Sequence, residues 1–248
     1  MSGHNKWSKI KRAKGAEDAK RSKVFSRLSK EITIAVKEGG EDPEGNPRLR
    51  TAILNAKGVS MPKDVIDRAI KKSNKDTTQF TELTYEGYAP NGIAIFLECA
   101  TDNTQRTIAK VRAIFNKHGG SLSKNGSLSF IFDRKGIFNI NQETIEDIEG
   151  FELEVIDAGA EDFEIDEEVI TITTSMEDFG HMQKKLEELN IEPENSGLER
   201  IPNNTEKLPV EKGLKILKMI DHFEEEEDVQ KVYHNLEITD ELMEAYEA

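Results

Sequence analysis

Cysteine and tryptophan are almost absent from this sequence, and it contains no long apolar run. The 248 residues include one cysteine and one tryptophan, and aromatic residues make up 6%. The lone Cys99 excludes an internal disulfide framework and fits a reducing compartment. The longest near-continuous apolar stretch, residues 92–100, is far shorter than the ~20 residues that cross a bilayer. Residues 1–14 lack the apolar core of a secretory signal. We therefore expect a soluble, cytoplasmic protein.

Residues that would indicate catalysis are also scarce. The five histidines show no metal-ligand spacing, a single cysteine cannot complete a thiolate site, and each histidine is expected at the surface or an edge. The glycine- and serine-rich run at residues 119–126 lacks the Gly-Lys-Ser/Thr ending of a phosphate-binding loop. These observations predict a protein that is not an enzyme and that uses no metal, cofactor or small-molecule substrate.

Charge is divided sharply along the chain. Residues 1–75, the basic segment, contain 19 lysines and arginines against 9 aspartates and glutamates, a net charge of +10. The remaining residues contain 15 against 39, a net charge of −24. A cationic segment on a chain that otherwise repels polyanions predicts nucleic-acid contact restricted to one end.

The basic segment is predicted to begin as a tail and to continue as helices. Residues 1–14 have too little apolar content to order themselves without an anionic partner. From about residue 16, apolar residues recur at helical spacing until Gly39-Gly40, with cations on the opposite face. Two shorter helices follow, beginning at Pro47 and Pro62. The candidate nucleic-acid-binding residues are Lys6, Trp7, Lys9, Lys11, Arg12, Lys14, Lys20, Arg21, Lys23, Arg27, Lys30, Arg48, Arg50 and Lys57.

The acidic part predicts an α+β architecture. Strands are expected at 81–88, 92–101 and 128–132, with a helix at 104–117. A βαββαβ run follows, with strands at 137–140, 163–165, 169–173 and 198–201 and helices at 143–158 and 177–189. This order is typical of a ferredoxin-like domain. A helix at 209–225 and a strand at 229–236 would complete a second ferredoxin-like unit into which the first is inserted.

These elements predict three domains. The first is a basic tail and helical domain at residues 1–78, the second is a discontinuous ferredoxin-like domain at 79–134 and 204–248, and the third is the inserted domain at 135–203. The loop at 119–127 is most simply a long connection, although a lysine there could contact a second anionic partner. Its candidate contact residues are Ser121, Ser123, Lys124 and Asn125.

Seven short segments are distributed over almost the whole chain. They are GHNKWSKIK at 3–11, DAKRSKVFSRL at 18–28, NPRLR at 46–50, NAK at 55–57, MPKD at 61–64, YEGYAP at 85–90 and DVQKVYHN at 228–235. In this order they resemble the YebC/PmpR family, which includes a mitochondrial translational activator of cytochrome c oxidase subunit I.

The resemblance implies a helical N-terminal domain and two α/β domains, one interrupting the other. It also implies one of two functions. Some family members are described as DNA-binding transcriptional regulators. Others are described as ribosome-associated factors that help the ribosome to translate difficult sequences. Both partners are phosphate polymers, so the charge pattern leaves DNA and ribosomal RNA open as alternatives. We expect no membrane partner and a monomer.

Overall fold

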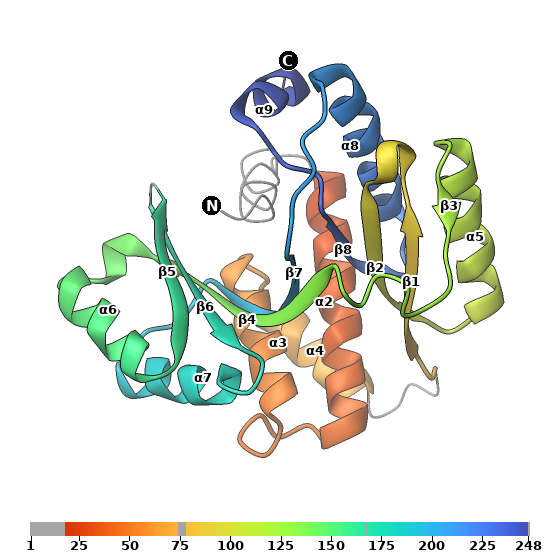
Figure 1. The fold of residues 1–248 in the computed structure, drawn as a ribbon. Helices are drawn as coiled ribbons and strands as arrows, with labels where there is room; N and C mark the ends of the chain where they lie inside the picture. The colour runs from red at the N-terminus through yellow and green to blue at the C-terminus, as the bar shows by residue number, and fades with distance from the viewer. Residues whose placement is uncertain (1–17, 74–77, 167, 248) are drawn as a thin grey trace. The chain divides into compact units, whose positions relative to one another are not determined.

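Two four-stranded antiparallel sheets follow an N-terminal region of three helices in this α+β chain (Figure 1). The computed structural model describes residues 18–73, 78–166 and 168–247. These residues form two compact units, one made of residues 18–23, 78–133 and 201–247 and the other of residues 24–73, 134–166 and 168–200. The predicted boundaries of the three domains stay a prediction.

The three helices pack around one apolar core. They are α2 (Asp18–Gly39), α3 (Pro47–Gly58) and α4 (Lys63–Ser73). Ile32, Leu49 and Ile66 supply one buried side chain from each helix. Asn46 fixes the connection between the first two, because its side chain accepts from the Leu49 N–H at 3.0 Å and donates to the Ala35 carbonyl at 2.7 Å. The same side chain therefore caps α3 and holds the end of α2.

The second sheet has the strand order of a ferredoxin-like domain. Its strands and helices are β4 (Phe132–Asn141), α6 (Ile148–Asp157), β5 (Ala160–Asp166), β6 (Val169–Ser175), α7 (Phe179–Glu188) and β7 (Asn195–Pro202). The order across the sheet is β5-β6-β4-β7, and β6 pairs antiparallel with both β4 and β5. The two strands joined by α6 are thus separated by β6, which is the split βαβ arrangement. Phe138, Val155 and Leu186 are among the core residues that bind both helices to the sheet.

The first sheet has the same spatial arrangement but a different chain order. Its elements are β1 (Thr81–Tyr88), β2 (Ala94–Thr101), α5 (Thr104–Lys117), β3 (Ser121–Leu122), α8 (Val210–Glu225), β8 (Val229–His234) and α9 (Asp240–Glu247). The order across the sheet is β3-β1-β2-β8. All of β4 to β7 lie in the sequence between β3 and β8, so one ferredoxin-like arrangement is inserted into the other.

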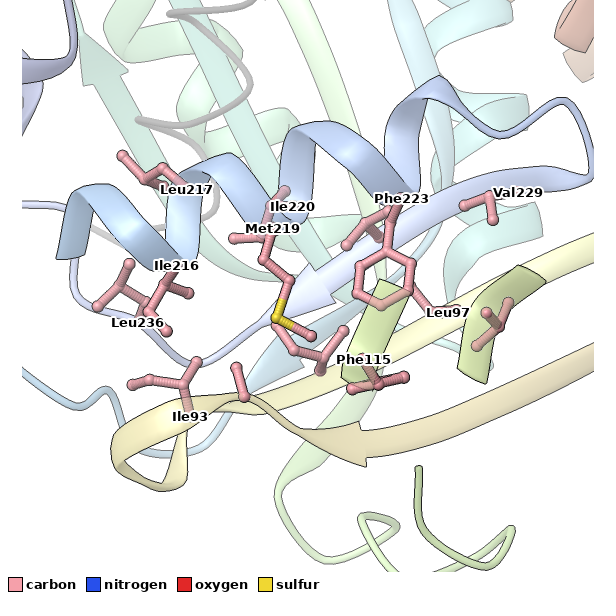
Figure 2. Packing of buried hydrophobic residues seen from close by; sticks show 14 of the residues in the cluster. Ile93, Leu97, Phe115, Ile216, Leu217, Met219, Ile220, Phe223, Val229 and Leu236 are labelled. Carbon is pink, nitrogen blue, oxygen red and sulfur yellow. The ribbon is translucent and has the colours of Figure 1, made fainter. Parts of the chain in front are cut away.

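Helices cover one face of this first sheet. Ile93 and Leu97 from the region of β2 meet Ile216, Ile220 and Phe223 of α8 in one buried cluster (Figure 2). Phe115 of α5 lies with its ring centroid 4.9 Å from that of Phe223, so the two helices share the same core. Cys99 is buried in this cluster as a free thiol.

Two sequence predictions need correction. Residues 128–132 are not a strand, because turns occupy the segment and only Phe132 begins β4. The helix predicted from residue 143 begins at Ile148, because Asp147 caps it by accepting from the Gly150 N–H. Helix α9 was not predicted. His234 is buried at 2% exposure, although it lies on β8 at the edge of the first sheet.

Candidate nucleic-acid interface

Helix α2 presents its predicted cations with unequal exposure. Arg21 and Lys23 are exposed near its start, whereas Arg27 and Lys30 are half-buried. Burial lowers the pKa of the Arg27 guanidinium from its ordinary value, although an arginine keeps its charge in a protein. The side chain of Lys20 lies outside the described residues. Among the described cations of α2, Arg21 and Lys23 are therefore the accessible ones at its N-terminal end.

The predicted residues of the tail also lie outside the described part of the chain. They are Lys6, Trp7, Lys9, Lys11, Arg12 and Lys14. Their role in binding stays a prediction based on sequence.

The predicted cations of α3 have carboxylate partners. Arg48 pairs with Glu38 at 2.6 Å, and Lys57 approaches Glu192 at 3.7 Å. Arg50 approaches Glu187 of α7 at 3.2 Å, although the two residues are 137 positions apart. Exposed ion pairs contribute roughly 0–1 kcal/mol each, so these cations remain able to exchange a carboxylate for a phosphate.

Helix α3 also joins the helical region to the second sheet. The side-chain amide of Asn55 exchanges two hydrogen bonds with the backbone of Ser196, and Gln183 donates to Thr51 at 3.2 Å. Gly58 lies so close to the carbonyl oxygen of Glu194 that a Cβ atom there would overlap it. Sequence reasoning missed this contact, and a signal for it was the glycine at the end of α3, which a helix alone does not require.

The second candidate contact, at residues 121–125, is more ordered than its glycine and serine content suggests. Ser121 lies on β3, which pairs with β1, and the Ser123 N–H donates to the Glu86 carbonyl at 2.7 Å. Lys124 and Asn125 are exposed beyond these contacts. The structure therefore holds the start of this loop against β1 and leaves its cationic residue, Lys124, exposed.

Two of the histidines that sequence analysis treated separately form a pair. Nε2 of His118 lies 2.6 Å from Nδ1 of His222, which joins the end of α5 to α8. Burial, His222 and Lys117 lower the pKa of His118 from its ordinary value. The described residues contain no group of three or more histidine, cysteine or carboxylate side chains that could hold a metal ion. No helix in this part of the chain is long and apolar enough to cross a bilayer.

Comparisons with known proteins cover almost the whole chain. One family model, described as the TACO1/YebC protein N-terminal domain, matches residues 5–76, and a second, the TACO1/YebC second and third domain, matches residues 80–236. The chain is 54% identical over 239 residues to a "Probable transcriptional regulatory protein" of Amoebophilus asiaticus, with 95% of this chain and 98% of that protein covered.

Other relatives agree with this result. A "Probable transcriptional regulatory protein" of Chlorobaculum parvum is 47% identical over 250 residues, covering 100% of this chain and 99% of the relative. The crystal structure of a conserved hypothetical protein from Aquifex aeolicus has a TM-score of 0.80 and 41% identity, covering 90% of this chain and 93% of that one. The two curated relatives are named as regulators and not as enzymes.

Proposed function

The chain belongs to the TACO1/YebC family, and we propose that it is a non-enzymatic regulator of transcription that binds DNA through its basic segment. The observation that carries the proposal is the change from +10 to −24 in net charge at residue 75, together with the exposed Arg21 and Lys23 of α2. The printed names of the curated relatives support regulation of transcription. The protein acts in the cytoplasm, as a monomer and without a cofactor.

Phosphate neutralisation supplies the binding energy in this proposal. Lysine and arginine side chains displace counterions from the DNA backbone, and the acidic remainder of the chain keeps other surfaces away from it. Such contacts set position and affinity, and they carry little sequence information by themselves. If roughly six phosphates are contacted, the logarithm of the affinity falls with the logarithm of the salt concentration at a slope near −5.

The test is a salt titration of duplex DNA binding with matched charge variants. The double variant R21E/K23E should weaken binding at least about tenfold and flatten the salt slope by about two. The control K212E/K218E makes the same change in net charge on α8, where both lysines are exposed. An equal loss in both variants would mean that net charge alone acts. A wild-type affinity that does not change with salt would refute the proposal.

A second function is favoured by the size of the acidic remainder. A partner that displays both RNA and basic protein surfaces, as a ribosome does, would accept the +10 segment and the −24 remainder together. In this alternative the chain is a ribosome-associated translation factor that relieves stalled translation. In-cell crosslinking with sequencing of the attached nucleic acid, combined with gradient sedimentation, separates the two. Promoter DNA without ribosomal co-sedimentation supports transcription, and enriched ribosomal RNA with co-sedimentation supports translation.

A further inference from the structure

Phe130 is the most exposed large apolar side chain among the residues that the structure describes. Phe130 is 72% exposed, whereas Leu128 and Phe132, two residues away on either side, are buried at 0% and 3%. The two buried neighbours pack with Ala94 and Tyr233 against the first sheet. Phe130 is therefore held outward by a segment whose adjacent apolar residues are anchored.

Phe130 lies in the segment of residues 123–131. The buried carboxylate of Glu86 anchors this segment by two hydrogen bonds. One carboxylate oxygen accepts from the Gly126 N–H and the other from the Leu128 N–H, both at 2.7 Å. Glu86 is only 3% exposed, so both charge-assisted bonds are shielded from water. Two backbone amides of the same turn are therefore bound by one carboxylate.

Two further sets of contacts complete the support. Successive turns join Lys124 to Ser127, Gly126 to Ser129 and Leu128 to Ile131 by backbone hydrogen bonds. Asn203 binds the far end, since its backbone N–H donates to the Ile131 carbonyl at 2.8 Å and its side chain donates to the Phe130 carbonyl at 3.2 Å. The backbone that carries Phe130 is thus tied at both ends.

The sequence that leads into and through the segment carries cations and no carboxylates, which favours an anionic partner. Residues 103–132 form the longest run of the sequence without an aspartate or glutamate, and they carry Arg106, Lys110, Arg112, Lys117 and Lys124. Arg106 and Lys110 pair with carboxylates, but Lys124 stands exposed within the tied segment itself. In a remainder with a net charge of −24, this run is a local exception.

We propose that Phe130 stacks on an unpaired nucleobase while Lys124 neutralises a neighbouring phosphate. An exposed aromatic ring and a cation on one anchored segment form a combination by which proteins hold single-stranded nucleic acid, because every base has a face on which a ring can stack. Bases within a duplex are already stacked on both faces, so the site selects an unpaired base. The inference rests on the proposed function, since it assumes that the chain binds nucleic acid.

The experiment measures the affinity of the full chain for a short single-stranded oligonucleotide containing 2-aminopurine, made as DNA and as RNA, and for the matching DNA duplex. In the wild type, stacking on Phe130 should quench the fluorescence of 2-aminopurine. F130A should weaken single-strand binding about tenfold and abolish this quenching, with duplex affinity almost unchanged. F130W should retain binding, and F130L should lose most of it because leucine has no ring to stack. L153A is the matched control, since Leu153 is 66% exposed and lies on α6.

The role of Lys124 is tested by the salt dependence of single-strand binding. K124A should reduce the salt slope of single-strand binding by about one, and K218A, a control at another exposed lysine, should leave it unchanged. The DNA and RNA arms show which nucleic acid supplies the base.

The outcomes separate the two proposals. If the wild type binds none of the three probes, the proposed function fails. If it binds the duplex but not the single strand, or if F130A or F130L binds the single strand like the wild type, only the stacking inference is overturned. If F130A keeps wild-type affinity for the single strand and loses only the binding of a protein, the stacking inference is also overturned.

Discussion

The side-chain amide of Asn55 and the backbone of Ser196 are joined by two hydrogen bonds of 2.8 Å, one in each direction. The Asn55 side chain donates to the Ser196 carbonyl and accepts from the Ser196 N–H, which is the pattern that a neighbouring strand would make. The residues are 141 positions apart and connect α3 with β7 inside one compact unit. The pair makes the helical region and the second sheet depend on each other for stability.

Removing the amide should destabilise the fold. N55A leaves the N–H and carbonyl of the buried Ser196 without these partners, which costs roughly 1–3 kcal/mol. Urea unfolding measures the change as a lower midpoint with an unchanged slope. N204A, at an exposed asparagine, is the control and should stay within about 0.5 kcal/mol of the wild type. Equal midpoints for N55A and the control would show that the pair contributes nothing.

Adding one methyl group at Gly58 should be more harmful than at other glycines. In G58A the new Cβ would overlap the Glu194 carbonyl, so α3 must move away from its neighbour, at a cost of about 1–3 kcal/mol. G180A is the matched control, because no atom lies within 4 Å of a Cβ built there on α7. That variant should be neutral or slightly stabilising, since alanine is the better helix former. Thermal unfolding of both variants tests the ranking.

Changing Glu86 should loosen the 123–131 segment without altering any of its residues. In E86Q one oxygen becomes an NH₂ group that faces a backbone N–H, so one charge-assisted bond is replaced by a repulsion. We expect faster amide hydrogen exchange at Gly126 and Leu128 and a loss of about 2 kcal/mol in the free energy of unfolding. E82Q, at an exposed glutamate on the same strand, should leave both amides protected. Unchanged exchange in E86Q would contradict the anchoring role.

His118 should make stability sensitive to mild acid. Its folded pKa is lowered from 6.5, chiefly by burial and then by His222 and Lys117. The unfolded chain therefore binds the proton more tightly, and the stability that neutral His118 contributes is complete above pH 6.5 and is lost as the pH falls through the lower folded pKa. The urea midpoint of the wild type should fall more steeply between about pH 7 and 5 than that of H118Q. H181Q, at an exposed histidine, should follow the wild type, and parallel curves for H118Q would refute the prediction.

Local sequence was sufficient for elements that are bounded by clear turn or capping residues. The strand predicted at 81–88 and the helix predicted at 104–117 match β1 and α5 to the residue. The prediction failed at 128–132 because the backbone partners there come from Glu86, about 40 residues earlier, and from local turns. An apolar composition could not distinguish that arrangement from a strand.

The positions of the candidate cations were predictable from the sequence, but their ion-pair partners were not. Sequence counts located the basic segment, and helical spacing located the cations of α2. They could not reveal that Arg50 and Lys57 face Glu187 and Glu192, because such pairs depend on how distant segments fold together. Nor did any sequence pattern predict that Phe130 stays outside while its neighbours are buried.

The insertion of one sheet into the other sets the order in which a newly synthesised chain can fold. The second sheet is complete once residue 202 has been made, but β2 lacks its neighbour β8 until residue 234. During that interval the apolar strand β2 has an unpaired edge, which is the kind of surface that recruits other chains. Nascent chains that end before Val229 should therefore aggregate even though most of the sequence is present, and their survival would depend on chaperones that bind exposed strands.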